Sequence, residues 1–251
     1  MRIAFDIIGS RERAIALVTD MNISAKKAKK FAEEICSRYK HVKSVIWKTG
    51  KKHKKYRIFP YKHLLGSKNY TVIHKEYGYK IKIDPTKAFF SVREGEERQR
   101  IAKKIKNGDS VLVLFAGVAP YAVAIAKQKR VSITCVEWNS SAVRYAKENI
   151  KLNKLKGIKI LKGDVKKIKL GKFDKILMPL GTEAIKYLEN AVSFAKKGSV
   201  IYLYGKSRDH GRDLKAEIKK KMKKKYRILR VQKVANYSPG VEKVRVDIKI
   251  L

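Results

Sequence analysis

The second half of the sequence alternates between short apolar runs of strand length and longer segments with helical periodicity. We expect strands over residues 110–115, 132–137, 158–161, 175–178 and 199–204, and helices over residues 96–106, 121–128, 142–153 and 183–196. Strands that are separated by helices pair in parallel, through right-handed crossover connections. This alternation predicts an α/β fold with a central parallel sheet.

The C-terminal segment changes this pattern. A very basic helix is expected over residues 214–225, and two strands over residues 227–234 and 241–250. The residues Asn236-Tyr237-Ser238-Pro239-Gly240 between these strands are turn formers, which makes the last pair antiparallel. A doubly wound, Rossmann-like sheet that ends in an antiparallel hairpin is typical of class I methyltransferases, which bind their cofactor at the carboxyl ends of the strands.

The N-terminal third reads as a smaller α/β unit. Strands are expected over residues 2–8, 42–47, 71–75 and 79–83, and a helix over residues 24–39 with Ser24 as its N-cap. The sequence therefore predicts a small α/β domain over residues 1–83, followed by a catalytic domain over residues 84–251.

Charge limits the class of partner. The chain has 62 Lys and Arg against 22 Asp and Glu, a formal net charge of +40. A field of this sign favours polyanions, above all nucleic acid, whereas thermophilic lysine enrichment usually raises Glu in parallel. The basic stretch at residues 51–57, which includes Tyr56, suits phosphate contact and base stacking, and it suits a solvated surface loop equally well.

Other features argue against membranes, secretion and metals. No apolar stretch approaches the roughly 18–20 residues of a transmembrane helix, and the N-terminus lacks the pattern of a signal peptide, so we expect a cytoplasmic protein. Cys36 and Cys135 are far apart and lack metal-ligand spacing. We expect two buried thiols and no metal.

Three strand ends carry groups that suit a nucleoside cofactor. Gly117 and Ala119 follow the first apolar strand of the catalytic domain and allow a ligand to approach the backbone. Glu137 ends the next strand about 20 residues later, where a carboxylate can accept hydrogen bonds from ribose hydroxyls. Asp164 follows the third strand, within reach of an adenine amino group. The combination favours a nucleoside cofactor over an unrelated glycine turn.

Several segments, in this order, resemble one enzyme family. It comprises the archaeal and eukaryotic tRNA (guanine-N1)-methyltransferases that act on guanosine 37, and their relatives in wyosine biosynthesis. The matching segments are Leu65-Gly66, Thr71-Val72-Ile73-His74-Lys75-Glu76-Tyr77-Gly78, Asp84, Phe90-Ser91-Val92-Arg93-Glu94-Gly95-Glu96-Glu97-Arg98, Phe115-Ala116-Gly117-Val118 and Tyr237-Ser238-Pro239-Gly240.

The resemblance implies roles for particular residues. It implies that Glu97 is the general base on guanine N1 and that Arg93 stabilises charge on O6. It implies a site for S-adenosyl-L-methionine, formed by Phe115, Gly117, Ala119, Glu137, Trp138, Asp164, Met178 and Pro179. It also implies that the anticodon stem-loop of tRNA, bound by a monomer, contacts Lys54, Lys55, Arg57, Arg98 and Tyr237.

The chain departs from the family pattern at several positions. Val113 replaces a common acidic residue on the first strand, and Ala119 replaces the second glycine of the turn. Val92 stands where a proline is expected before Arg93, and Phe59 where an arginine is often found. The segment Met178-Pro179-Leu180-Gly181 stands where the family commonly has Asn-Leu-Pro.

Methyl transfer to N1 of guanosine 37 is therefore the primary functional prediction, and the same segments suit a second methylation of a tricyclic wyosine precursor. Transfer of the aminocarboxypropyl group of the same cofactor is the alternative reaction. A basic tRNA-binding protein without catalytic activity is the alternative outside enzymes.

Overall fold

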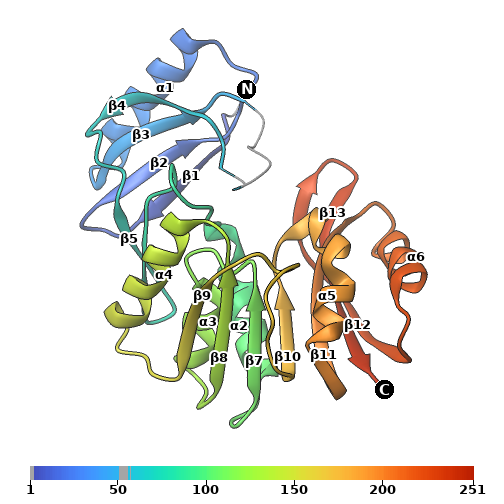
Figure 1. Cartoon of the computed structure of the whole chain (residues 1–251). Coiled ribbons are helices and arrows are strands. Elements are labelled where there is room, and N and C mark those ends of the chain that lie inside the picture. Colours follow the sequence, from blue (N-terminus) through green and yellow to red (C-terminus); the bar gives the residue numbers. More distant parts are fainter. Residues whose placement is uncertain (1–2, 51–55, 57) are drawn as a thin grey trace.

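A sheet of seven strands forms the larger part of the computed structural model, which describes residues 3–50, 56 and 58–251 (Figure 1). Its strand order is β12-β13-β11-β10-β7-β8-β9. The strands are β7 (Ser110–Leu114), β8 (Ser132–Glu137), β9 (Ile158–Lys162), β10 (Phe173–Met178), β11 (Ala195–Ser207), β12 (Tyr226–Ser238) and β13 (Val241–Ile250). Strands β11, β10, β7, β8 and β9 are parallel, and β12 and β13 are antiparallel. The predicted parallel sheet with a terminal antiparallel hairpin is confirmed.

Helices cover both faces of this sheet because its strands are apolar on both faces. On strand β7, Leu112 and Leu114 pack with helices α5 and α6, whereas Val111 and Val113 pack with helices α2 and α3. The helices are α2 (Gly95–Lys104), α3 (Pro120–Ala126), α4 (Ser140–Leu152), α5 (Leu188–Ser193) and α6 (Arg212–Lys221).

One predicted helix is wrong in length and type. The segment 183–196 was expected to form a single helix, but it contains a 3-10 helix, η2 (Gly181–Tyr187), followed by the short α5. Strand β11 already begins at Ala195, where it pairs with Phe173 of β10. The spacing of apolar residues does not distinguish a 3-10 helix from an α-helix. It also does not show where a helix ends and a strand that pairs with a distant segment begins.

The N-terminal residues form a separate sheet of four strands in the order β1-β2-β3-β4. Its elements are β1 (Phe5–Gly9), β2 (Ala14–Val18), α1 (Ala25–Arg38), β3 (Val42–Lys48) and β4 (Tyr61–Gly66). Ser24 caps α1 as predicted, because its hydroxyl oxygen accepts a hydrogen bond from the backbone N–H of Lys27 at 3.2 Å. Strands β2 and β4 were not predicted. A fully buried strand such as β2 is apolar throughout and has no alternation to reveal it.

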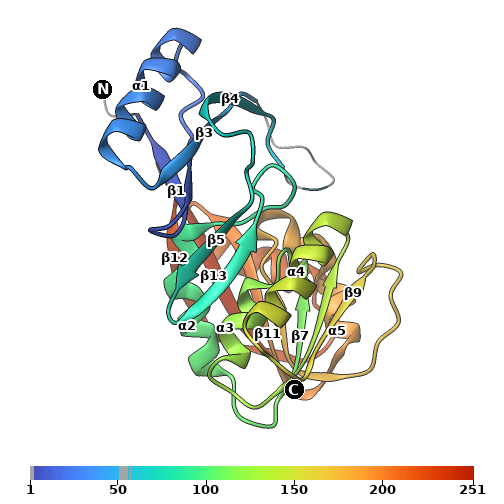
Figure 2. The same ribbon diagram turned by 90° about the vertical axis from the view of Figure 1, so that its left-hand side faces the viewer.

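A two-stranded hairpin, β5 (Val72–Glu76) and β6 (Tyr79–Ile83), connects the two sheets in sequence. It lies beside α4, as Figure 2 shows. The side chain of Asn149 accepts a hydrogen bond from the backbone N–H of Lys82 at 2.6 Å, and it donates one to the backbone carbonyl oxygen of Lys82 at 3.1 Å. Asn153 forms the same pair of bonds with Lys80, at 2.8 and 2.6 Å. We propose that residues 1–83 form a domain whose last hairpin docks onto the domain of residues 84–251.

No helix in the described part of the chain is long and apolar enough to cross a membrane.

The two cysteines differ in burial. Cys135 is completely buried, as expected, but Cys36 is only partly buried, and both thiols are free. Burial raises the pKa of both thiols, which keeps them in the protonated, unreactive form.

Candidate active site

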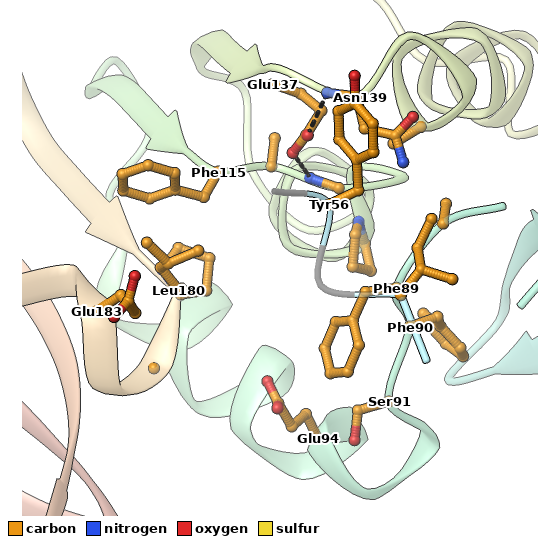
Figure 3. A pocket seen from close by; sticks show the side chains of 18 of the residues that line it. Tyr56, Phe89, Phe90, Ser91, Glu94, Phe115, Glu137, Asn139, Leu180 and Glu183 are labelled. Atoms are coloured by element: carbon orange, nitrogen blue, oxygen red, sulfur yellow. Dashed lines mark hydrogen bonds between the residues drawn. The ribbon is translucent and has the colours of Figure 1, made fainter. Parts of the chain in front are cut away.

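A cavity of about 840 Å³ lies between the N-terminal sheet and the carboxyl ends of strands β7 to β10 (Figure 3). Residues from distant parts of the sequence line it, because the N-terminal sheet contributes one wall and the catalytic sheet the other. Among the lining residues are Asp6, Lys48, Phe59, Phe89, Arg93, Glu94, Phe115, Gly117, Glu137, Trp138, Asp164, Pro179, Leu180, Lys206, Tyr237 and Lys243. The cavity lies where the sequence predicts a binding site, at the carboxyl ends of the strands.

The loop after β7 is held in place by Glu137, at the end of β8. Phe115 and Gly117 both adopt left-handed φ angles of 57°. The Glu137 carboxylate accepts hydrogen bonds from the backbone N–H of Gly117 at 2.7 Å and from that of Asn139 at 2.8 Å (Figure 3). A carboxylate has about four acceptor positions, so it can hold this loop and also bind ligand hydroxyls.

Asn139 connects this wall of the cavity to the segment that precedes α2. Its side-chain oxygen caps helix α4 by accepting a hydrogen bond from the backbone N–H of Ser141 at 2.9 Å. Its amide nitrogen donates to the carbonyl oxygen of Lys87 at 2.8 Å. The segment so anchored carries Phe89 and Phe90, which line the cavity. The amino-acid sequence around Asn139 did not predict this hydrogen bond to Lys87.

Several predicted cofactor residues lie on the cavity. Phe115, Gly117, Glu137, Trp138, Asp164 and Pro179 all line it. Asp164 accepts a hydrogen bond from the backbone N–H of Lys166 at 2.9 Å, which orders the turn after β9. The Phe115 ring packs edge-to-face on Tyr187, with the ring centres 4.9 Å apart. These positions fit the predicted ligand contacts.

Two predicted cofactor residues are misplaced. Ala119 and Met178 have no exposed surface and do not line the cavity. Ala119 begins helix α3 with a φ of 62°, and its methyl group packs in the core between the sheet and helices α2 and α3. Met178 ends β10 with its side chain in the opposite core, beside α5. The next two residues, Pro179 and Leu180, lie in the loop beyond the end of β10, and both line the cavity.

Arg93 and Arg98 have different environments. Arg93 lines the cavity, and its Nε donates to the Asp6 carboxylate at 2.7 Å, which joins the segment before α2 to strand β1. Arg98 also borders the cavity, but its side chain is 1% exposed and its guanidinium forms two hydrogen bonds of 2.6 Å with Glu76. A buried guanidinium that pairs with a carboxylate is held by that partner and does not reach a phosphate in solvent. The predicted contact of Arg98 with tRNA stays a prediction.

Glu97 lies outside the cavity, contrary to its expected position beside the target base. Its side chain is 2% exposed. One carboxylate oxygen accepts a hydrogen bond from the Tyr204 hydroxyl at 2.8 Å and forms an ion pair with Arg245, and the other accepts from Arg100 at 3.1 Å. Glu97 therefore joins α2 to β11 and β13 inside the core. Glu97 lies in the core and not at the cavity because its partners, Tyr204 on β11 and Arg245 on β13, are on the side of α2 that faces the sheet.

Of the remaining predicted tRNA contacts, Lys54, Lys55 and Arg57 lie outside the described residues. Tyr237 lies at the cavity with 57% of its surface exposed, and the Lys206 ammonium lies 3.4 Å from its ring centre. An exposed aromatic ring beside a cation suits contact with a base and a phosphate.

The sequence analysis missed seven charged residues at the cavity: Asp6, Lys48, Glu94, Glu183, Lys186, Lys206 and Lys243. An acidic residue within the first apolar strand was a visible signal for Asp6. Burial lowers the pKa of Lys48, whose ammonium lies 4.2 Å from the ring centre of Phe59. The other residues of this set had no distinctive signal, because charged residues are frequent throughout this chain.

The cavity combines two chemical environments. Glu137, Asp164 and the backbone of the Gly117 loop provide hydrogen-bond acceptors and donors at adjacent strand ends, which is the donor set that adenosine requires. Phe59, Phe89 and Phe90 provide an aromatic environment toward the N-terminal sheet. Within the described residues, no group of three His, Cys, Asp or Glu side chains is placed to hold a metal ion. The site thus fits an adenosine-containing cofactor together with a second planar ligand.

Comparison with known proteins identifies a family with these features. The model of the TRM5/TYW2 methyltransferase domain matches residues 72–232. The tRNA (guanine(37)-N(1))-methyltransferase Trm5b of Pyrococcus abyssi is 32% identical over 252 residues, which cover 98% of this chain and 74% of that protein. A tRNA(Phe) (4-demethylwyosine(37)-C(7)) aminocarboxypropyltransferase of Methanocaldococcus jannaschii is 30% identical over 197 residues, which cover 76% of this chain and 79% of that protein.

A solved structure gives the same result. The chain superposes with a TM-score of 0.87 on aTrm5 in its complex with tRNALeu, at 30% identity, over 100% of this chain and 72% of that one. Fold and sequence thus agree, and the chain belongs to the TRM5/TYW2 methyltransferase family.

Proposed function

We propose that this protein transfers the methyl group of S-adenosyl-L-methionine to N1 of guanosine 37 in the anticodon loop of tRNA. The observation that carries the proposal is one cavity with a nucleoside-binding wall at the strand ends and an aromatic wall from residues 59 and 89–90. The similarity to Trm5b of Pyrococcus abyssi supports guanosine 37 as the target.

The chain's own residues account for cofactor binding. Glu137 accepts hydrogen bonds from the ribose hydroxyls, Asp164 accepts one from the adenine amino group, and Trp138 covers the adenine ring. Gly117 has a left-handed φ of 57°, which L side chains rarely adopt, and its lack of a side chain lets the cofactor approach the backbone of this loop. The bound cofactor supplies an electrophilic methyl group on a sulfonium.

The target base occupies the aromatic part of the cavity. Phe89 and Phe59 offer ring faces to a base that has left the anticodon loop stack. Arg93, which the Asp6 carboxylate orients, donates hydrogen bonds toward O6, where negative charge grows as N1 loses its proton. These groups position the base and stabilise its ionised form.

The tRNA backbone follows the positive surface around the cavity mouth. Lys48, Lys206 and Tyr237 line this side of the cavity, and the whole chain carries +40. Phosphates release counterions on contact with such a surface, which favours association. We propose that the protein acts as a monomer, and a tRNA substrate supports a cytoplasmic location.

Aminocarboxypropyl transfer is the second candidate, supported by the similarity to the Methanocaldococcus jannaschii aminocarboxypropyltransferase. It requires the same cofactor with a different sulfonium substituent facing the nucleophile. A tricyclic wyosine precursor at position 37 is a further substrate, for which the wide aromatic wall provides contact area.

The decisive experiment is incubation of the purified protein with unmodified tRNA and cofactor, followed by nucleoside mass spectrometry. We expect 1-methylguanosine from wild-type tRNA and no product from tRNA with adenosine at position 37. A parallel incubation uses tRNA that carries 4-demethylwyosine at position 37, the substrate of the similar aminocarboxypropyltransferase, and an aminocarboxypropylated nucleoside from it would assign the protein to the alternative reaction. If the assay gave no product and calorimetry detected no cofactor binding, the result would favour the alternative of a tRNA-binding protein without catalytic activity.

A further inference from the structure

One cation of the cavity wall, Lys48, has no acidic partner among the described residues. It is the last residue of β3 and lines the cavity. Its ammonium lies 4.2 Å from the ring centre of Phe59, and no hydrogen bond or ion pair joins it to a described residue. By contrast, Lys186 and Lys243 of the same cavity each pair with a glutamate, at 2.7 and 2.6 Å. The N–H groups of Lys48 are therefore available to a ligand in the cavity.

The pleat of β3 directs Lys48 toward the cavity. Residues two apart on a strand lie on the same face of a sheet. Ile46 packs in a core cluster that also contains Phe90, from the segment before α2, so Lys48 lies on the face that meets the catalytic part of the chain. Asp6 of β1 lies on this face as well, two residues before Ile8 of the same cluster. The N-terminal sheet therefore places one cation and one carboxylate at the cavity.

Lys48, Asp6 and Arg93 form a group of charges with an excess of positive charge. Arg93 and Asp6 form an ion pair at 2.7 Å, which leaves the charge of Lys48 uncompensated. Burial lowers the pKa of Lys48, the charge of Asp6 opposes this shift, and the charge of Arg93 adds to it. The ammonium form is therefore less well stabilised here than in water. A ligand oxygen that carries negative charge would restore this stabilisation, so this part of the cavity favours such a ligand.

The ring of Phe59 holds the ammonium without using its capacity for hydrogen bonds. Lys48 pairs with Tyr61 of β4 across the sheet, and Phe59 lies two residues before Tyr61. An aromatic face attracts a cation but offers no lone pair, so an ammonium with three N–H donors can still bind an oxygen atom. A tRNA phosphate stays in water at the cavity mouth, whereas an oxygen of the target base comes to the aromatic wall that Phe59 helps to form. The position of Lys48 therefore favours the base.

We propose that the Lys48 ammonium donates a hydrogen bond to O6 of the target guanine and, together with Arg93, stabilises the negative charge that O6 gains as N1 loses its proton. The inference rests on the proposed function, which supplies this base. Lys48 remains an ammonium throughout, since it neither takes up nor releases a proton and forms no covalent bond. A fixed donor in a partly dehydrated site stabilises the growing charge more in the transition state than in the ground state.

Lys48→Met tests this role, because methionine keeps most of the length of the side chain and removes its charge. Under single-turnover conditions with saturating tRNA and cofactor, we expect the methylation rate to fall by roughly 10²–10³-fold, with both dissociation constants unchanged. Lys43→Met is the matched control, since Lys43 is exposed on the same strand, and its rate should equal that of the wild type. A wild-type rate for Lys48→Met would overturn the inference. A loss confined to tRNA affinity would also overturn it and make Lys48 a phosphate contact.

A modified tRNA keeps the test valid if Lys48→Met folds poorly. Sulfur accepts hydrogen bonds more weakly than oxygen, so tRNA with 6-thioguanosine at position 37 offers Lys48 a poorer acceptor. The factor by which Lys48→Met slows methylation should therefore be smaller for the thio-substituted tRNA than for the ordinary one. A variant that is merely misfolded slows both reactions by the same factor, and equal factors would overturn the inference.

The wild-type protein in the same assay tests the proposed function separately. If it makes no 1-methylguanosine, the proposed function fails and the role of Lys48 fails with it. If the wild type and Lys48→Met make 1-methylguanosine at the same rate, the proposed function stands and the role of Lys48 alone is wrong.

Discussion

Arg98 and Glu76 form a buried ion pair in which Nε and Nη2 of the guanidinium each lie 2.6 Å from a different carboxylate oxygen. Arg98 belongs to α2 and Glu76 to the hairpin β5–β6, so the pair links the catalytic domain to the hairpin that precedes it. A third hydrogen bond, from Nη1 to the carbonyl oxygen of Ser91 at 3.1 Å, holds the segment that carries Arg93 and Glu94. The position of the proposed active-site loop therefore depends on this pair.

Removal of one partner should destabilise the fold. Arg98→Met leaves the Glu76 charge buried with Tyr79 and His74 as its partners but without the guanidinium that neutralises it, and we expect the free energy of unfolding to fall by about 3–5 kcal/mol. Denaturant titration measures this change. The double variant Arg98→Met with Glu76→Leu should recover much of it. If Arg98→Met instead lowered tRNA affinity at unchanged stability, Arg98 would be a tRNA contact after all.

Acid should weaken the same ion pair. Burial by itself raises the pKa of Glu76, but hydrogen bonds from His74, Arg98 and Tyr79 outweigh it and lower the pKa to about 2. A carboxyl whose folded-state pKa lies below its unfolded value of about 4.5 contributes stability above that value and loses it as the pH falls toward 2. The shift corresponds to about 3 kcal/mol.

The measurement is the free energy of unfolding between roughly pH 6 and pH 2, with Glu76→Gln as the comparison. We expect the wild type to lose stability over this range more steeply than the variant does. Parallel curves for the two proteins would mean that other carboxylates determine the acid response.

Cofactor affinity should depend on Glu137. Glu137→Gln replaces a charged acceptor that also holds the backbone of Gly117 and Asn139. The charge-assisted hydrogen bonds that the variant cannot form are worth about 1.5–3 kcal/mol, so calorimetry should show a dissociation constant raised by roughly 10- to 150-fold. Glu148→Gln is a suitable control, because Glu148 pairs with Lys82 at the surface of α4. Equal affinities for wild type and Glu137→Gln would remove Glu137 from the cofactor site.

The basic end of α6 should contribute to tRNA affinity. Lys219, Lys220 and Lys221 are exposed, whereas Leu214 and Ile218 pack the same helix against the sheet. Replacing the three lysines with glutamine should weaken tRNA binding, because fewer counterions are released from the phosphates. The log–log slope of affinity against salt should become shallower by about 0.7–0.9 for each phosphate that these lysines neutralise in the wild type.

Filter binding over a range of salt concentrations measures this slope, and cofactor affinity should stay constant. The same triple replacement of Lys26, Lys29 and Lys30 on α1 shows whether the effect belongs to α6. An unchanged slope for the α6 variant would mean that these lysines form only a solvated surface.

The sequence by itself determined the architecture of the catalytic sheet and the position of its ligand site. Strand and helix periodicity is local, and the rule that parallel strands end at one edge of a sheet needs no knowledge of packing. Gly117, Glu137 and Asp164 were therefore identified from their places at strand ends, and all three line the cavity. Continuous apolar runs such as β2 have no such periodicity, and that strand was missed.

Only the tertiary structure decided which charged groups face the cavity. Glu97 and Arg98 are adjacent on a helix whose surroundings come from elsewhere in the chain: Arg245 lies 148 residues after Glu97, and Glu76 lies 22 residues before Arg98. Whether a charge is buried or available depends on the partners that folding brings to it, and a family motif does not specify those partners. The same long-range packing placed Lys243 and Tyr121 around Glu94, which lines the cavity.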